Sequence, residues 1–371
     1  MPFRASGRGA YGPQGQRVIK GPLAPVWTTF SPTAITTANA TGYSYTFVAS
    51  DDSGDNPTYT LASGSVPTGL SLSTAGVLSG TANTSGTYTY TINATDVNGR
   101  TTTSPSISHT VTLAVSYQIA LMGGGGSYPN SEQGRTGHGG CGVFTMDSSP
   151  GKVIGYVVGG AASGTTPGSP GGGGGSPGPA GAGGGGTWIT YPGSSGWDNI
   201  AAAVGGGGGG CYYSDWAGNG GAMNGNGGTA VDPFGSPVGG GATTSGPGGG
   251  YSSGSGHTGG YGCSWGAGGG GGYYGGGGGA CDQQGQGGTP GGGGSGWISI
   301  PSGLGTNVNV LYNQGGGAAN SGISGATDLG GSTYFGDANR GKGQNQGGLR
   351  IWKAGTLVLD VGASTGSFTL P

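Results

Sequence analysis

The chain has 371 residues, of which 32% are hydrophobic and 6% are charged, and its net charge at neutral pH is −2. Ordinary globular proteins contain about 45–50% apolar and 25% charged residues, so one large apolar core is excluded. Disorder at low hydrophobicity goes with a high net charge, so charge repulsion does not shape this chain either.

Residues 1–24 are predicted to form an extended arm, because they carry basic residues, no acidic residue and several glycines and prolines. Apolar side chains within the arm favour docking on a neighbouring subunit over binding of nucleic acid. The candidate docking residues are Arg4, Arg8, Tyr11, Arg17 and Ile19. The arm lacks the apolar region of a signal peptide, and no run approaches the roughly 18 apolar residues of a membrane span.

Residues 25–115 are predicted to form an antiparallel β-sandwich of about seven strands. Polar and apolar residues alternate in 43–48, 87–92 and 109–113, so every second side chain can face a core. His109 is expected to face solvent. The region contains no cysteine, which excludes the disulfide-linked antibody type.

Three stretches, 66–73, 76–81 and 86–96, resemble the immunoglobulin- and cadherin-like modules of bacterial surface proteins and phage proteins. That resemblance implies a spacer or an anchor. Cadherins bind calcium between modules, and oxygen ligands for calcium are available in Asp51, Asp52, Asp55, Asp96 and Asn98. The spacing is unlike that of an EF-hand and the chain has a single module, so solvated turn carboxylates are the favoured interpretation and no metal is expected.

Residues 116–371 are predicted to form a folded glycine-rich domain, although such composition is typical of flexible linkers. The segment 123–348 holds 86 of the 102 glycines, together with five of the seven tryptophans. Strand-like runs separate the glycines at 117–121, 152–158, 188–191, 297–300, 308–312 and 349–352. These runs predict a second, jelly-roll-like β-sandwich with glycine tracts inserted between its strands.

The glycine tracts are predicted to form a bundle of polyglycine-II helices. Tracts such as 205–210 and 275–279 have no side chains to pack, yet ordering glycine is entropically costly. A left-handed helix with three residues per turn points its amide groups outward, so neighbouring copies can bond to one another. Collagen is excluded because glycine does not recur strictly at every third residue; disorder is the alternative. The expected fold class is all-β with essentially no α-helix.

The tracts and their flanks at 204–213, 266–274 and 291–298 resemble the glycine-rich domains of phage tail proteins and of distal tail-fibre adhesins from T-even-type phages. They also resemble the extracellular glycine-rich region of anaplastic lymphoma kinase and leukocyte tyrosine kinase receptors, but the chain has no kinase part. The arm at 8–16, followed by the immunoglobulin-like module, resembles virion structural proteins of cyanobacterial and marine myoviruses.

These resemblances imply a phage virion structural protein, made in the host cytoplasm and exposed on the particle surface. Its expected partners are other virion proteins, further copies of itself, and a host surface glycan or outer-membrane protein, with no direct nucleic-acid role. The alternative is a decoration protein that stabilises or shields the capsid or tail. A third class, ice binding by flat polyglycine faces, gains no support from the module or the arm.

Aromatic side chains at the junctions of glycine tracts are the candidate receptor-binding residues, because tyrosine and tryptophan give rigid contact area at low entropy cost. They are Tyr212, Tyr213, Trp216, Tyr251, His257, Tyr261, Trp265, Tyr273 and Tyr274. The equally weighted alternative is that half of them cap the glycine layers or fill a core.

No enzyme activity and no cofactor are expected. The three histidines, His109, His138 and His257, are far apart, and no catalytic triad or metal-ligand cluster stands out. Four cysteines lack the CxxC spacing of zinc or redox sites, so both disulfides and buried thiols stay open. They are Cys141, Cys211, Cys263 and Cys281.

Overall fold

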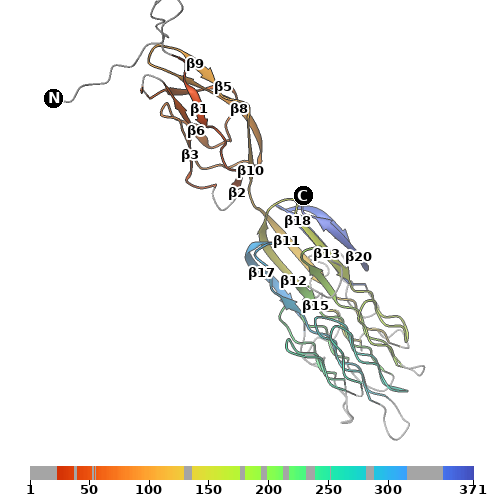
Figure 1. Ribbon diagram of the computed structural model, residues 1–371. Helices are drawn as coiled ribbons and strands as arrows, with labels where there is room; N and C mark the ends of the chain where they lie inside the picture. The colour runs from red at the N-terminus through yellow and green to blue at the C-terminus, as the bar shows by residue number, and fades with distance from the viewer. Residues whose placement is uncertain are drawn as a thin grey trace, which may run out of the picture. The chain divides into compact units, whose positions relative to one another are not determined.

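A computed structural model describes residues 23–36, 40–51, 54, 56–128, 136–175, 180–193, 199–211, 217–230, 239–250, 252–280, 288–315 and 346–371. They belong to two compact units, and the boundary in the chain lies between Ala114 and Val115 (Figure 1). Every regular element in these ranges is a β-strand, which confirms the all-β class. Over the same ranges, no helix is long and apolar enough to cross a membrane. The docking candidates in the arm precede residue 23 and lie outside the described residues.

The described residues of the first unit contain ten strands in three small sheets. They are β1 (Val26–Thr29), β2 (Ile35–Thr36), β3 (Tyr43–Thr46), β4 (Val48–Ser50), β5 (Thr58–Gly64), β6 (Leu70–Leu72), β7 (Val77–Gly80), β8 (Gly86–Thr95), β9 (Thr101–Thr103) and β10 (Ile107–Thr112). The largest sheet has the order β2-β10-β8-β5, with β9 also on β8; β3-β7-β6 and β1-β4 form the other two. One pair, β2 with β10, is parallel, unlike the antiparallel arrangement expected, because the two strands are joined through the whole module and not by a hairpin.

Alternation along β8 and β10 builds the core of the first unit. Tyr90, Ile92 and Ala94 of β8 are buried, and Thr91 and Asn93 between them are less buried and lie on the other face. On β10, His109 is in phase with the buried Ile107 and Val111 and is only 1% exposed. The expectation that His109 faces solvent is therefore wrong.

The second unit is a sandwich of two five-stranded sheets whose strand pairs are all antiparallel. One sheet has the order β17-β12-β11-β18-β19 and the other β16-β15-β14-β13-β20 (Figure 1). The strands are β11 (Val115–Met122), β12 (Cys141–Ser148), β13 (Val153–Val158), β14 (Thr187–Thr190), β15 (Ile200–Val204), β16 (Trp297–Ile298), β17 (Thr306–Gln314), β18 (Gly348–Lys353), β19 (Thr356–Val361) and β20 (Ser364–Thr369).

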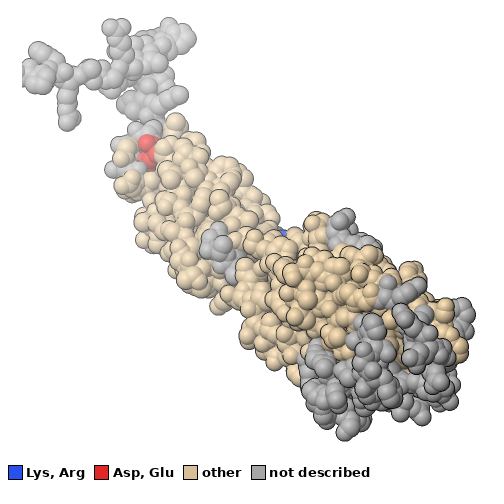
Figure 2. All heavy atoms as spheres, turned by 90° about the horizontal axis from the view of Figure 1, so that it is seen from below, with Lys and Arg blue, Asp and Glu red and all other residues tan. Residues whose placement is uncertain are grey.

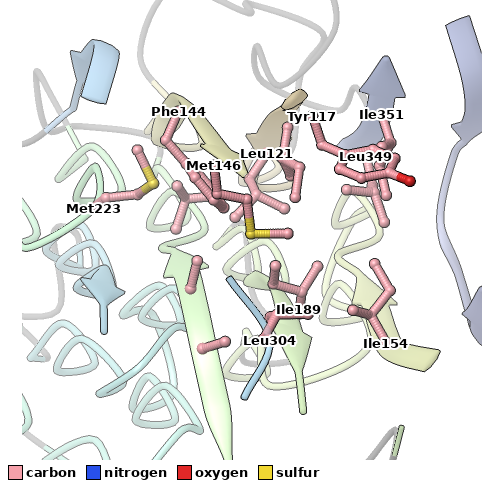
Figure 3. Packing of buried hydrophobic residues seen from close by; sticks show 14 of the residues in the cluster. Tyr117, Leu121, Phe144, Met146, Ile154, Ile189, Met223, Leu304, Leu349 and Ile351 are labelled. Atoms are coloured by element: carbon pink, nitrogen blue, oxygen red, sulfur yellow. The ribbon is translucent and has the colours of Figure 1, made fainter. Parts of the chain in front are cut away.

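The apolar core of the second unit lies between these two sheets (Figure 3). Alternate residues of β11, β12 and β18 face residues of β13 and β14, as the stick view shows. The labelled core residues are Tyr117, Leu121, Phe144, Met146, Ile154, Ile189, Met223, Leu304, Leu349 and Ile351. This compact apolar layer anchors the glycine-rich segments that leave the sheets.

Glycine segments continue directly from six strands at one end of the sandwich (Figure 1). They start or end at residues 123, 140, 159, 186, 205 and 296, next to β11, β12, β13, β14, β15 and β16. At this junction the buried Thr187 hydroxyl donates to the Met122 carbonyl oxygen at 2.6 Å and accepts from the Gly159 amide at 2.9 Å. Thr187 thereby joins the end of one sheet to the other.

Backbone hydrogen bonds of the segment 205–210 recur with a period of three residues. The amides of Gly205 and Gly208 donate to carbonyl oxygens in 218–221. Those of the next two glycines, 206 and 209, donate to 268–271, and those of 207 and 210 donate to 124–127. The N–O distances run from 2.6 to 3.1 Å. The carbonyl oxygens accept in the same rhythm from 137–140, 291–294 and 181–184. One glycine segment is therefore bonded to six neighbouring segments.

Four further segments have amide and carbonyl partners in the same repeating pattern: 181–185, 267–272, 275–279 and 291–296. Such contacts are close enough to exclude a side chain. A Cβ atom on Gly207 would lie 1.9 Å from the Gly137 carbonyl oxygen, and one on Gly208 would lie 2.0 Å from that of Gly291. The glycines here are required by packing, because backbone occupies the space of the side chain.

No charged residue occurs in the described parts of 123–140, 159–186, 205–230, 239–280 and 288–296. On the face of the molecule drawn in Figure 2, few Lys, Arg, Asp or Glu atoms appear among the described residues. Hydrogen bonds between uncharged backbone groups, and not ion pairs, hold these segments together.

Candidate binding surface

Ala180, Cys211 and Ala267 pack together in a small buried cluster, here called the distal end. The Cys211 thiol donates to the Gly288 carbonyl oxygen, and the Ala267 amide donates to the Thr289 carbonyl oxygen at 3.0 Å. Because Gly205 follows β15 directly, Cys211 lies at the opposite end of the same segment from the sandwich.

Two candidate receptor-binding residues, Tyr261 and Trp265, lie at or next to the distal end and are exposed. Tyr261 is 64% exposed and Trp265 is 40% exposed. Trp265 lies in a tight turn at 263–266, closed by the Gly266 amide donating to the Cys263 carbonyl oxygen at 3.0 Å, and Tyr261 precedes this turn. A Cβ on Gly288 would lie 1.7 Å from the Trp265 carbonyl oxygen, so the backbone of Trp265 packs directly on the distal end.

The backbone between these two aromatics is fixed at several points. The Gly262 amide donates to the Gly174 carbonyl oxygen at 3.1 Å, and the Cys263 amide donates to that of Gly279 at 3.3 Å. Cys263 is also disulfide-bonded and only 5% exposed. The side chains of Tyr261 and Trp265 therefore extend from a backbone with little freedom to move.

Three other candidates lie together at the opposite end of the segments, beside the sandwich. Tyr273 stacks on Trp297 of β16 with ring centroids 4.8 Å apart and also contacts Tyr274 and His257 edge-on. Tyr273 and Trp297 pack against the buried Trp188. This cluster joins the glycine segments to the outer face of a sheet, as the core-filling alternative expected for part of the set.

The nine candidates therefore do not form one surface. Tyr212, Tyr213, Trp216 and Tyr251 lie outside the described residues. Cys211 and Ala217, which precede and follow the first three in the sequence, are both buried, and Cys211 belongs to the distal end. Sequence reasoning treated all tract junctions as equivalent, because it could not tell which end of a segment meets the sandwich.

The cysteines fall into two chemical states. Cys263 is disulfide-bonded, whereas Cys141 and Cys211 are buried thiols. Cys281 lies outside the described residues. A thiol inside a strand and a disulfide at a distal turn share no spacing signal, which is why the sequence left both states open.

Titratable groups in the first unit serve the fold. One oxygen of Asp96 accepts from the Asn98 and Arg100 amides, both at 2.8 Å, and the other pairs with the Arg100 guanidinium at 2.7 Å. Burial opposes ionisation of Asp96, but these bonds outweigh it and lower its pKa. The carboxylate of Asp96 thus belongs to a tight turn, but it is buried and not solvated as expected, because it is enclosed by the groups that donate to it. Asp52 and Asp55 lie outside the described residues.

His109 is buried, and both of its ring nitrogens have hydrogen-bond partners. Its Nε2 donates to the Thr33 carbonyl oxygen at 3.0 Å, which leaves Nδ1 to accept from the Tyr90 hydroxyl at 3.1 Å. Burial lowers the pKa of His109 below 6.5, and the bond to Thr33 opposes this shift only in part. Among the described residues, no three His, Cys, Asp or Glu side chains are grouped so as to hold a metal ion.

Comparison with known proteins identifies the first unit. Residues 24–112 match the family model described as "Putative Ig domain", so this part of the chain is an immunoglobulin-like module. No curated protein matches the chain. Among solved structures, protocadherin gamma B2 extracellular cadherin domains 3–6 match with 18% identity, over 36% of this chain and 35% of that one. The TM-score is 0.24, too low for that likeness to carry an argument, and the chain spans about a third of that structure's length.

Proposed function

We propose that the glycine segments are polyglycine-II helices packed as a rigid hexagonal bundle on a jelly-roll-like scaffold. The period-three hydrogen bonding of 205–210 supports the helices, because a polyproline-II-type helix has three residues per turn. Six bonded neighbours around one segment support the hexagonal packing. None of the glycines in 205–210 has a positive φ, in keeping with the φ near −75° of such a helix.

The function that this geometry supports best is that of a phage virion structural protein of the tail-fibre or adhesin type. The observation that carries the proposal is the exposed aromatic pair, Tyr261 and Trp265, on a hydrogen-bonded base at the distal end. Binding to a rigid surface loses less conformational entropy than binding to a mobile loop. The immunoglobulin-like module and the arm would attach the chain to other virion proteins.

The location of the chain on virions tests this proposal. Gold-labelled antibody against the chain should mark a few positions at fibre ends. A regular array over the shell or tail would contradict the adhesin function and support the alternative, a decoration protein.

Binding of the purified chain to bacterial cells is the second test. We expect the fluorescently labelled chain to adsorb to cells of the phage's host and not to cells that resist the phage by surface alteration. Equal adsorption to both kinds of cell, or none to either, would contradict receptor recognition.

A further inference from the structure

We infer that Asn98 is a site of spontaneous modification, where the side-chain amide is converted to aspartate and isoaspartate, while the fold protects three other asparagines in the same sequence context. Glycine follows asparagine four times in the chain, at 98–99, 219–220, 224–225 and 226–227. Because glycine has no Cβ to hinder attack on its neighbour, all four pairs are reactive in an unfolded chain. The described residues include all four pairs, and their surroundings differ.

The reaction consumes water and needs no other reagent. The main-chain nitrogen of Gly99 loses its proton and attacks Cγ of Asn98, and the new C–N bond closes a five-membered succinimide ring. The bond from Cγ to Nδ2 breaks, and Nδ2 takes up the proton and leaves as ammonia. Water then opens the ring. Opening at Cγ gives aspartate, and opening at the main-chain carbonyl carbon gives isoaspartate, in which the chain runs through Cβ and Cγ.

Asn98 and Gly99 are both exposed, in the turn between β8 and β9. Asn98 is held through its main-chain amide, which donates to the Asp96 carboxylate at 2.8 Å. A Cβ placed on Gly99 would meet no atom within 4 Å, so the space beside the attacking residue is open. The Gly99 amide donates to the Asp96 carbonyl oxygen at 3.1 Å, and this bond must open before attack. Exposed turns open at a low cost in free energy.

The three asparagines of the glycine-rich domain are held by their side chains. In each of them Oδ1 accepts a hydrogen bond from a distant main-chain amide: from His138 to Asn219 at 2.9 Å, from Ile298 to Asn224 at 3.0 Å and from Thr244 to Asn226 at 3.0 Å. Such a carboxamide turns its Cγ toward the following nitrogen only by losing this bond. The fold therefore opposes ring closure at all three.

The attacking nitrogens of these three pairs are held as well. The amides of Gly220, Gly225 and Gly227 donate to main-chain carbonyl oxygens at 2.7, 2.7 and 2.8 Å, and Gly220 and Gly227 are buried. Reaction there requires both the side-chain bond and the amide bond to open within packed backbone. In the folded chain, Asn98 should therefore react at least about tenfold faster than any of the three.

Modification of Asn98 weakens its own turn. The turn is closed by the Asp96 amide donating to the Arg100 carbonyl oxygen at 3.0 Å, and by the Arg100 amide donating to the Asp96 carboxylate at 2.8 Å. Isoaspartate inserts one more atom into the main chain between these residues, so the two bonds lose their geometry. Both products also add a negative charge near the buried Asp96 carboxylate. We expect the aged immunoglobulin-like module to unfold at a lower temperature and the glycine-rich domain at its original one.

The experiment incubates the full chain in warm, mildly alkaline buffer and follows deamidation of each asparagine by mass spectrometry of its proteolytic peptides. A parallel sample unfolded in urea gives the intrinsic reactivity of the four pairs, which should be similar. Isoaspartate is measured with protein isoaspartyl methyltransferase. Asn98→Gln is the matched control, because it keeps a carboxamide but would have to form a six-membered ring. It should neither deamidate nor lose thermal stability during the incubation.

Preferential modification of Asn98 in the folded chain, with all four pairs reacting in urea, supports the inference. It is overturned if Asn98 stays intact in the folded chain while the urea sample reacts. It is overturned equally if the asparagines at 219, 224 and 226 keep pace with Asn98 in the folded chain. An aged wild type that loses no more thermal stability than aged Asn98→Gln would contradict the effect on the turn. None of these outcomes bears on the proposed adhesin function.

Discussion

A single methyl group on an interior glycine has no space in this structure. The Cβ of Gly207→Ala would lie 1.9 Å from a carbonyl oxygen, whereas the same change at Gly249 meets no atom within 4 Å. Overpacking typically costs about 1–3 kcal/mol, and a backbone neighbour cannot rotate away as a side chain can. We expect Gly207→Ala to lower the thermal midpoint of the glycine-rich domain clearly and Gly249→Ala to leave it nearly unchanged. Equal midpoints for the two variants would contradict the packing described.

The second prediction at this scale concerns His109, whose pKa is lowered in the folded module. The unfolded chain takes up a proton as the pH falls through about 6.5, whereas the folded chain does so only at lower pH. Stability is therefore undiminished above pH 6.5 and falls as the pH drops from there toward the folded pKa. Ring-proton NMR of the intact chain should give a midpoint below 6.5 for His109. A midpoint at or above 6.5 would refute this, and His109→Gln should remove the corresponding loss of stability.

At the scale of the element, the junction between sandwich and glycine segments depends on one hydroxyl. Thr187→Val keeps the shape of the side chain but leaves the Gly159 amide and the Met122 carbonyl without their bonds to it. An unsatisfied buried polar group costs about 1–3 kcal/mol. Chemical denaturation should show a loss of that order for Thr187→Val and almost none for the exposed Thr365→Val on β20. If Thr187→Val left the free energy of unfolding unchanged, water or a rearrangement would have to replace the hydroxyl.

The elements also show what the sequence could and could not predict. Runs rich in valine, isoleucine or aromatic residues, such as those of β13 and β18, were identified because alternation and β-branching are local signals. β15 was missed because its three alanines carry no strand preference. Ala201 and Ala202 lie in the core between the sheets, and Ala203 packs in the cluster of Trp188. β12 was missed because glycine and cysteine begin it.

The prediction of candidate-site residues from the sequence was limited in a different way. Composition singled out the aromatic residues, yet Tyr273 and Trp265 look alike in sequence and lie at opposite ends of the glycine segments. Only long-range pairing distinguishes the two ends, and tracts without side chains carry no register signal. His109 illustrates the same limit on a smaller scale, because a shift of one residue in phase exchanges the buried and exposed faces of a strand.

For the whole molecule, the decisive prediction is resistance of the glycine segments to hydrogen exchange. Amides in 205–210 and 291–296 are bonded to backbone or side-chain groups, so they should exchange slowly in the native protein. The exposed Gly249 and Gly250 should exchange fast and serve as the internal control. Rapid exchange throughout 205–210 would show that the segments behave as a tether, and the rigid base of the proposed binding surface would be lost with them.

The lack of ionic groups in the described glycine segments has one more consequence. Attraction between charges weakens as dissolved ions screen it, over about 10 Å at 0.1 M salt and only about 3 Å at 1 M. Contacts between amides of uncharged glycines carry no such dependence. We therefore expect the stability of the glycine-rich domain to be the same in dilute freshwater and in concentrated brine.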